Sequence, residues 1–375
     1  MRCFRPRISK AADEVDKKAA AVQKWQPSQN EQVSRDVREG GDAGAQHGSR
    51  YQLSRLMRPD DANIAGNVHG GNIFKMIEEA GCIVATRHCN NQNGERCLAA
   101  LVRVEKTDFL APVFVGEVAS VTADISYTSK HSIEVQVKVM AENILTGAKK
   151  LASKAAVWFV PMSLQDVGKI AEVPPIKYAS AEQEEEGRKR YDAQKMERLE
   201  TKAKIEEIVP PPANPEQHTV GFSQHSLIHL VGPSDCTLKD YVNGGVTMKL
   251  MDEAAGLTAF RHCRTNVVTA SVDVINFHRK IKKGCVVTVT GRLTFVSNKS
   301  MEIEVLVDAS SLMEAEKYRA ASAFFTFISL DKDNKPLPVP PLKVEGEEEQ
   351  RRFEEGKARY LQNKAKRLAD KERKQ

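Results

Sequence analysis

Two Gly-Gly pairs, Gly70-Gly71 and Gly244-Gly245, each have polar residues seven positions before and seven positions after them. Around the first pair these residues are Asn63 and Glu78, and around the second pair they are Thr237 and Asp252. A carboxylate can act as a general base or a nucleophile, and a side-chain amide can orient a water or a carbonyl. Because the two copies differ at these positions, the four residues are the candidates for chemistry.

The glycines themselves suit a binding role. Glycines directly before a helix let a ligand approach backbone N–H groups at the positive end of the helix dipole. Such a site fits an oxyanion or a polarised carbonyl. A tight turn that binds nothing is the alternative, and one copy of the motif does not decide between them.

The two carboxylates are expected on the outside of their helices. At about 100° per residue, Glu78 and Asp252 lie off the apolar stripe, so each is predicted to face solvent or another subunit. For a lone carboxylate, solvent is the commoner environment.

The Gly-Gly pairs belong to an internal repeat that covers almost everything after residue 50. In the register set by these pairs, the triplet at 87–89 (Arg-His-Cys) recurs at 261–263. The next loop is shorter in the second copy, and beyond it the polar segment 129–132 matches 297–300. The Val-Pro-Pro stretches and a Glu-Glu-Gly-Arg/Lys motif continue the match. The chain is therefore two copies of one unit.

Each unit has the same predicted order of elements. A short apolar stretch (51–57; 226–231) leads through a loop to one amphipathic helix of about four or five turns. Four β-rich runs follow, at 98–105, 117–127, 132–140 and 151–160 in the first unit and at 267–275, 285–295, 301–307 and 320–329 in the second. One helix with an antiparallel meander predicts an α+β unit whose sheet covers its helix.

The remaining segments set the predicted domain boundaries. These are a disordered arm at 1–50, a first domain at 51–178, a charged helical linker at 179–217, a second domain at 218–342 and a charged helical tail at 343–375. The arm is polar without an apolar period, and its basic start lacks the apolar core of a secretory signal. A mitochondrial presequence is disfavoured, and the charged helices are expected to be solvated or to pack between subunits.

Composition excludes several classes of protein. The net charge of +6 is too small to indicate nucleic-acid binding, and no apolar run could span a bilayer. Seven cysteines without a C-x-x-C pair favour a reduced, soluble, intracellular protein. The sequence lacks the motifs of serine hydrolases, P-loop enzymes and zinc sites. The repeated Arg-His-Cys triplet is interpreted as core packing and helix capping rather than as a metal or thiolate site.

The first motif resembles that of the hotdog-fold acyl-CoA thioesterases. It runs Asn63, Gly66, Val68, Gly70 and Gly71 into a helix that carries an acid. The resemblance covers roughly residues 51–375 and implies two tandem hotdog domains, each a long helix wrapped by an antiparallel sheet.

The resemblance also implies a reaction and a site. In the family, the active site forms where two hotdog units meet, which pairs Asn63 with Asp252. The reciprocal pair, Thr237 with Glu78, departs from the family pattern, so we predict one working site per chain. The implied reaction is hydrolysis of long-chain fatty acyl-CoA to fatty acid and CoA, with Gly71 N–H polarising the carbonyl. Whether Asp252 is base or nucleophile stays open.

The implied partners are fatty acyl-CoA and CoA, with no cofactor, metal, nucleic acid or membrane span. The polar segments that resemble the family's CoA-contacting loop are Ser129, Lys130, His131, Ser132, Ser297, Asn298, Lys299 and Ser300. Simple β-turns are an equally good interpretation of them. His69 becomes Asn243 in the second copy, which indicates a structural role. The resemblance further implies a cytosolic homo-oligomer, either a trimer of double hotdogs that makes a ring of six units or a homohexamer.

Two alternatives remain. A hotdog enoyl-CoA hydratase would require a catalytic Asp/His pair, and no such pair stands near either Gly-Gly turn. A non-catalytic acyl-CoA sensor would give no reason for Asn63 and Asp252 to match chemically. Release of free thiol distinguishes a hydrolase from a sensor.

Overall fold

The computed structural model describes residues 50–63, 66–90, 95–166, 168–201, 210–312 and 317–372, with backbone only at 198–201 and 370–372. All of them belong to one compact unit, His47–Gln375. The predicted disordered arm therefore lies outside the described residues, apart from Arg50, which begins the first strand.

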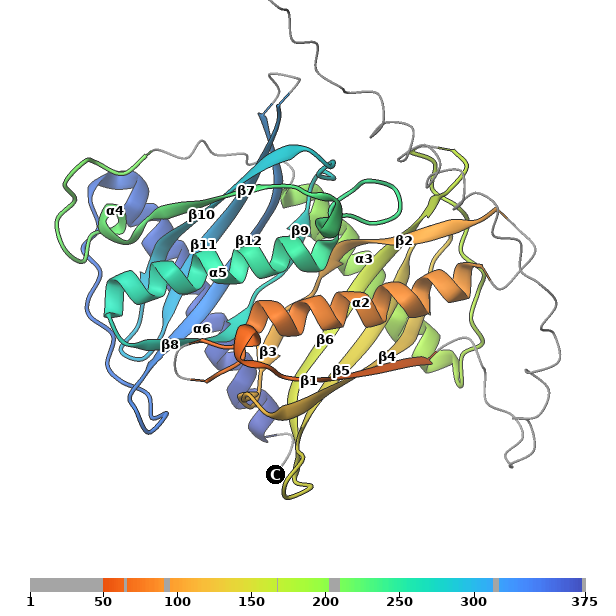
Figure 1. The fold of residues 1–375 in the computed structure, drawn as a ribbon, viewed down its shortest axis with the longest axis horizontal. Coiled ribbons are helices and arrows are strands. Elements are labelled where there is room, and N and C mark those ends of the chain that lie inside the picture. The colour runs from red at the N-terminus through yellow and green to blue at the C-terminus, as the bar shows by residue number, and fades with distance from the viewer. Residues whose placement is uncertain are drawn as a thin grey trace, which may run out of the picture. The chain divides into compact units, whose positions relative to one another are not determined.

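The elements follow the same order in both halves of this unit (Figure 1). The first half contains β1 (Arg50–Leu56), η1 (Pro59–Asp61), α2 (Gly70–Cys89), β2 (Cys97–Val104), β3 (Thr107–Phe109), β4 (Glu117–Thr128), β5 (Ile133–Asn143), β6 (Lys149–Ser163) and α3 (Ala181–Thr201). The second half contains α4 (Val220–Ser223), β7 (His225–Leu230), η2 (Pro233–Asp235), α5 (Gly244–Cys263), β8 (Asn266–Val272), β9 (Ile275–Phe277), β10 (Cys285–Val296), β11 (Met301–Ser311), β12 (Lys317–Leu330) and α6 (Gly346–Glu372). The predicted α+β repeat is confirmed.

The strands of both halves form one antiparallel sheet. Its order is β1-β4-β5-β6-β2-β9-β12-β11-β10-β7, and β3 and β8 pair with each other beside this path. The halves join where β2 meets β9, with Arg103 opposite Asn276, and where β3 meets β8, with Thr107 opposite Val272. Alternating burial along β4 shows that one face of the sheet covers the core. Because the sheet is continuous, it fixes the position of the first Gly-Gly motif relative to the second.

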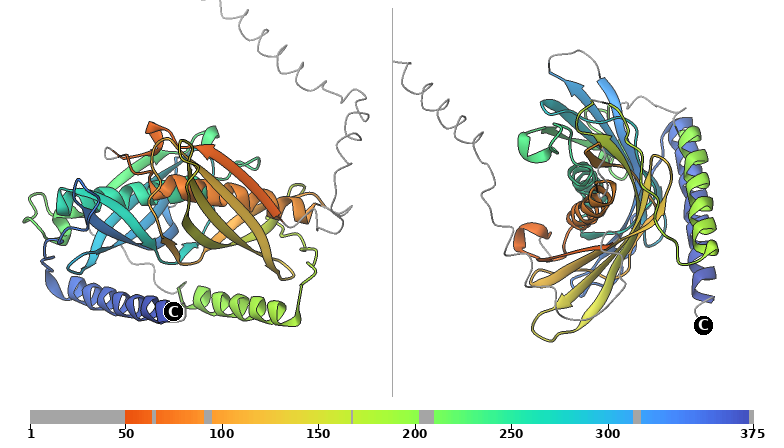
Figure 2. Two further views of the ribbon diagram at one scale, coloured as in Figure 1. Left: turned by 90° about the horizontal axis from the view of Figure 1, so that it is seen from below. Right: turned by 90° about the vertical axis from the view of Figure 1, so that its right-hand side faces the viewer.

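Helices α2 and α5 lie side by side in the hollow of the sheet, and α3 and α6 lie on its other face (Figure 2). The two central helices approach each other closely at their N-termini. A Cβ at Gly71 would lie 2.7 Å from the Cα of Lys249, and one at Gly245 would lie 2.9 Å from the Cα of Lys75. The second glycine of each pair is thus required by helix packing.

The outer helices are bound to the sheet by arginines close to the repeated Glu-Glu-Gly motif. Arg190 of α3 donates to both carboxylate oxygens of the buried Glu134 at 2.8 Å, and Arg359 of α6 does the same to Glu302 at 3.1 and 2.7 Å. The expectation that these helices are only solvated or packed between subunits is therefore wrong for one face of each helix. The ion pairs, placed at equivalent points of the repeat, attach each helix to its half of the sheet.

The Arg-His-Cys triplets have a structural role. Nε2 of His88 lies 2.7 Å from the carbonyl oxygen of Pro174, and Nε2 of His262 lies 2.9 Å from that of Pro340. Cys89 is buried in the core. The triplets pack against the core and connect the C-termini of α2 and α5 to the Pro-Pro stretches, whereas the helix C-caps are the following residues, Asn90 and Arg264.

Candidate active site

A cavity of about 780 Å³ lies where the two halves meet, and it contains Asn63 from the first half and Asp252 from the second. Its polar end is formed by the N-terminus of α2, by the loop before it and by α5. The structure thus brings together the two residues that the sequence paired. They are far apart in the chain, and the continuous sheet and the contact between α2 and α5 place them in one cavity.

Asp252 is held by two hydrogen bonds from two different elements. The backbone N–H of Gly71 donates to Oδ2 at 2.9 Å, and the hydroxyl of Thr269 on β8 donates to Oδ1 at 2.6 Å. The residue is 2% exposed. The expectation that it faces solvent is wrong, because α2 covers the side of α5 that a wheel of α5 alone shows as polar. The unit that it faces is the other half of the same chain.

Gly70 also lies close to the carboxylate of Asp252. A Cβ at Gly70 would lie 3.1 Å from Oδ1 of Asp252. The first glycine therefore allows the carboxylate to approach the start of α2. The N–H of Gly71, which the sequence suggested as a donor to a substrate carbonyl, is engaged with the Asp252 carboxylate in this structure.

The side-chain amide of Asn63 is oriented by hydrogen bonds at both its oxygen and its nitrogen. Its Oδ1 accepts from the N–H of Asn67 at 3.1 Å, and its Nδ2 donates to Oδ1 of Asn266 on β8 at 3.1 Å. Gly66 closes the loop with a φ of 81°, a conformation that favours glycine. The amide is therefore presented to the cavity in one orientation.

Burial raises the pKa of Asp252 above the usual range of an aspartate. The Thr269 hydroxyl, the Gly71 N–H and the nearby His69 act in the opposite direction by stabilising the ionised form. His69 precedes α2 and lines the cavity. A carboxylate whose pKa is raised toward neutrality is a better general base than an exposed one.

Most of the remaining cavity wall is apolar. It comes from α5, from β8 and β12, and from the segment after β3, and includes Leu110, Val113, Leu257, Phe260, Phe327 and Ile328. Glu253 and Asn334 also line it, and no lysine or arginine among the described residues does so. The site is thus the Asp252 carboxylate and the Asn63 amide at one end of a mainly apolar chamber.

Comparison with known proteins shows which family has this motif and fold. Residues 65–148 and 240–316 match the family model described as the thioesterase superfamily. The chain is 68% identical over 317 residues to the cytosolic acyl coenzyme A thioester hydrolase of Mus musculus, covering 84% of this chain and 83% of that protein. It is 69% identical over 315 residues to the protein of the same name from Homo sapiens, with the same coverage. The chain therefore belongs to the family of cytosolic acyl coenzyme A thioester hydrolases, within the thioesterase superfamily.

Solved structures were compared as well. A putative oleoyl thioesterase from Lactobacillus plantarum has the same fold, with a TM-score of 0.50 and 11% identity, covering 76% of this chain and 98% of that one. An acyl-CoA hydrolase from Bacillus cereus matches with a TM-score of 0.39 and 30% identity, covering 42% of this chain and 96% of its own. Together with the family model and the mouse and human relatives, the fold confirms the hotdog assignment, the family and the enzyme class predicted from the motif.

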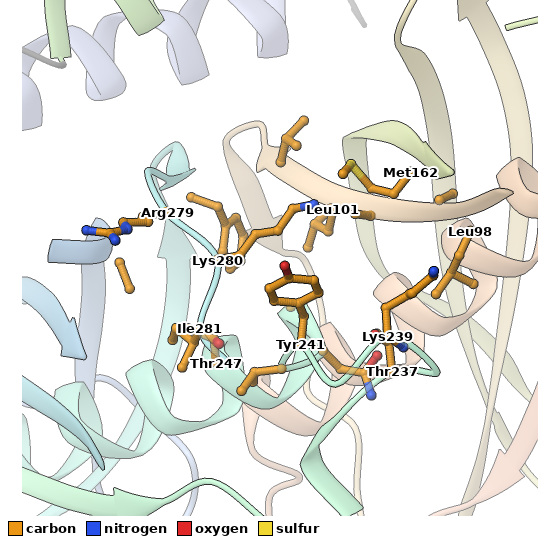
Figure 3. Close-up of a pocket in the computed structure, with 18 of the residues that line it drawn as sticks. Leu98, Leu101, Met162, Thr237, Lys239, Tyr241, Thr247, Arg279, Lys280 and Ile281 are labelled. Carbon is orange, nitrogen blue, oxygen red and sulfur yellow. Dashed lines mark hydrogen bonds between the residues drawn. The ribbon is translucent and has the colours of Figure 1, made fainter. Parts of the chain in front are cut away.

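The second pair of candidate residues also shares a cavity. Thr237 and Glu78 line a pocket of about 210 Å³ at the other junction of the two halves (Figure 3). Glu78 is 8% exposed, so the expectation that it faces solvent is wrong for the same reason as for Asp252. Burial, with the charge of Glu79, raises the pKa of Glu78 to about 7. The loop is retained, since Thr237 N–H donates to the carbonyl of Tyr241 at 2.7 Å.

Two residues of the first site were missed by sequence reasoning. Thr269 and Asn266 lie on β8, and their counterparts in the repeat are Leu101 and Leu98 on β2. Leucine cannot donate to a carboxylate or accept from an amide. The replacement of two polar residues by two leucines was visible in the repeat, and it is the same signal that distinguished Asn63 from Thr237.

The predicted CoA-contacting loops lie elsewhere. They are tight turns between β4 and β5 and between β10 and β11, in which the Ser129 hydroxyl lies 2.7 Å from that of Ser132 and the Ser297 hydroxyl 2.7 Å from that of Ser300. Neither turn contributes a lining residue to the two pockets described above. Their polar groups are explained by the turns, and contact with CoA stays a prediction.

No group of three or more His, Cys, Asp or Glu side chains in the described ranges is placed to hold a metal ion. No helix among the described residues is long and apolar enough to cross a membrane. The absence of a cofactor stays a prediction.

Proposed function

We propose that the chain hydrolyses long-chain fatty acyl-CoA to fatty acid and CoA at one site, the cavity between Asn63 and Asp252. The observation that supports this proposal most is the arrangement of Asp252, a buried carboxylate of one half that accepts hydrogen bonds from Gly71 of the other half and from Thr269. The name of the mouse and human relatives, cytosolic acyl coenzyme A thioester hydrolase, agrees with it. By the same likeness we place the reaction in the cytosol.

The geometry supports a direct chemical path. With the thioester carbonyl between Asn63 and the N-terminus of α2, the Asn63 amide donates a hydrogen bond to a water or to the carbonyl oxygen. Asp252 takes a proton from that water as it attacks the carbonyl carbon. The C–S bond then breaks and the CoA thiolate takes up the proton. Attack by Asp252 itself, through a mixed anhydride, uses the same two residues, and oxygen-18 from water distinguishes the two paths.

The cavity also supports the choice of a long acyl chain. Its volume of about 780 Å³ lies in the range of sites that enclose most of a drug-sized ligand. Its wall beyond the carboxylate is mainly apolar, with Leu257 and Phe260 from α5 and Phe327 and Ile328 from β12. Burial of methylene groups there stabilises the complex by about 0.8 kcal/mol each. We therefore expect affinity to rise with chain length until the wall is filled.

The test is thiol release from palmitoyl-CoA, followed with a thiol-reactive dye, by wild type, Asp252→Asn and Asn63→Ala. We expect a loss of the order of 10²–10⁴ in kcat for Asp252→Asn, since a positioned base contributes about that much. Thr237→Ala, the matched change in the second pocket, is the control and should keep wild-type turnover. Equal turnover of Asp252→Asn and wild type would contradict the site. If wild type released no thiol from any acyl-CoA, the sensor alternative would replace the hydrolase proposal.

The assembly remains a separate proposal. We infer a trimer of double hotdogs from the resemblance to the family, and light scattering of the full chain measures it directly. A monomer in solution with full thiol release would contradict the assembly and leave the site unchanged.

A further inference from the structure

The second pocket has changed from the first in charge as well as in its polar residues. At equivalent positions of the repeat, Arg279 and Lys280 stand where the first site has Ala111 and Pro112. Both cationic residues line the second pocket, together with Lys239. Among the residues that the structure describes, no lysine or arginine lines the first pocket. The second pocket thus differs from the first in its candidate polar residues and also in cations that attract an anion.

The cationic side chains are positioned by their neighbours. The Arg279 guanidinium lies 4.1 Å from the centre of the Tyr318 ring, and the Lys280 ammonium lies 5.1 Å from that of Tyr241. The Lys239 ammonium donates to the carbonyl of Leu164, which uses one of its three N–H bonds. Figure 3 shows Lys239, Tyr241 and Lys280 around one opening. A ring and a backbone carbonyl thus position Lys280 and Lys239 beside the pocket, whereas Arg279 is directed to the other side, over the Tyr318 ring (Figure 3).

The interior of the pocket is narrow and has one buried acid. Its volume of about 210 Å³ compares with about 780 Å³ at the first site. Leu98, Leu101 and Met162 form an apolar wall. Glu78, 8% exposed, lines the pocket, and its Oε2 would lie 3.4 Å from a Cβ at Gly245. The carboxyl group of the pocket therefore lies beside the start of α5.

We propose that the second pocket binds free CoA, the thiol product, without hydrolysing anything. CoA combines phosphate groups, which fit the cationic opening, with a slender uncharged pantetheine arm, which fits the narrow interior. The thiol end then lies against Glu78 and the hydroxyl of Thr247, which also lines the pocket. A long acyl chain does not fit in this volume, so the pocket distinguishes product from substrate. This inference rests on the proposed function, because hydrolysis is what supplies free CoA.

The test is equilibrium dialysis of the full chain with two probes, CoA and S-hexadecyl-CoA, a thioether that cannot be hydrolysed. We expect two CoA molecules and one S-hexadecyl-CoA molecule per chain. In Arg279→Ala/Lys280→Ala, the affinity of one CoA site should fall at least about tenfold while the other is unchanged. Leu98→Phe, which narrows the pocket without changing charge, should remove the same site. Arg188→Ala/Lys189→Ala, two exposed cations of α3, is the matched control.

Several outcomes would overturn the inference. They are one CoA per chain in wild type, two S-hexadecyl-CoA per chain, or an unchanged second site in both pocket variants. A higher KM for palmitoyl-CoA in Arg279→Ala/Lys280→Ala, with one CoA per chain in wild type, would show that these cations serve the first site instead. Thiol release by wild type is measured on the same preparation, so failure of the hydrolase is seen separately from failure of this pocket.

Discussion

The two pockets have the same backbone framework, and they differ in the hydrogen bonds that their side chains can donate. The loop before each helix has the same bonds, with Asn63 N–H donating to the carbonyl of Asn67 in one copy and Thr237 N–H to that of Tyr241 in the other. Yet Asp252 accepts a hydroxyl hydrogen bond from Thr269, whereas Glu78 has Leu101 at the equivalent position. The fold therefore supplies two pockets with a buried acid, and they differ in whether a side-chain donor faces that acid.

The comparison of the two pockets predicts that thioester hydrolysis can be transferred from the first pocket to the second. Four changes, Thr237→Asn, Glu78→Asp, Leu98→Asn and Leu101→Thr, copy the polar residues of the first site into the second. In a chain inactivated by Asp252→Asn, they should raise thiol release at least about 10²-fold, the contribution of a positioned base. Because the second pocket is small, the substrate for this measurement is a short-chain acyl-CoA. The same protein with Glu78 retained is the control. No recovery in a folded protein would show that activity needs more than these side chains.

The buried acid of the second pocket predicts a pH-dependent stability. Glu78 has a pKa of about 7 in the folded chain and an ordinary value when unfolded, so folding is favoured most below the unfolded pKa. That contribution is lost as the pH rises through 7. Glu78→Gln should therefore gain up to about 3 kcal/mol over wild type between pH 4 and pH 8, measured by urea unfolding. Glu182→Gln, an exposed acid of α3, is the control. A difference that does not change with pH would contradict the burial of an ionisable group.

The hydroxyl on β8 predicts a smaller loss at the first site. Thr269→Val removes the donor to Asp252 at nearly constant volume and should cost about 2 kcal/mol, or about 30-fold in kcat. Since this bond lowers the pKa of Asp252, the acid limb of the rate profile should move to higher pH. Thr269→Ser should restore the wild-type kcat and the wild-type position of the acid limb, and Leu101→Val should change neither quantity. Loss of rate without a shift of the acid limb would assign Thr269 a packing role only.

The family resemblance implied the pairing of Asn63 with Asp252, and it could be applied because both residues follow recognisable motifs. Asn63 and Asp252 stand at constant distances from Gly-Gly pairs, and the internal repeat showed which positions differ. Thr269 and Asn266 were missed because a strand residue carries no local motif; its role depends on a pairing of elements far apart in the chain. The burial of Asp252 was missed for a related reason, because one helix wheel cannot show the second helix that covers it.

The amide network predicts the smallest of these effects. Asn266 accepts a hydrogen bond from Asn63 at 3.1 Å, and both groups are neutral, so the bond should contribute about 1 kcal/mol. Asn266→Leu, the residue found at the equivalent position of the second pocket, should lower kcat/KM for palmitoyl-CoA about fivefold. Leu98→Asn, the reverse change in the other pocket, is the matched control and should leave it unaltered. If Asn266→Leu keeps wild-type turnover, the Asn67 N–H alone suffices to orient Asn63, and the two pockets then differ in activity through Asp252 and Thr269 rather than through the amide pair.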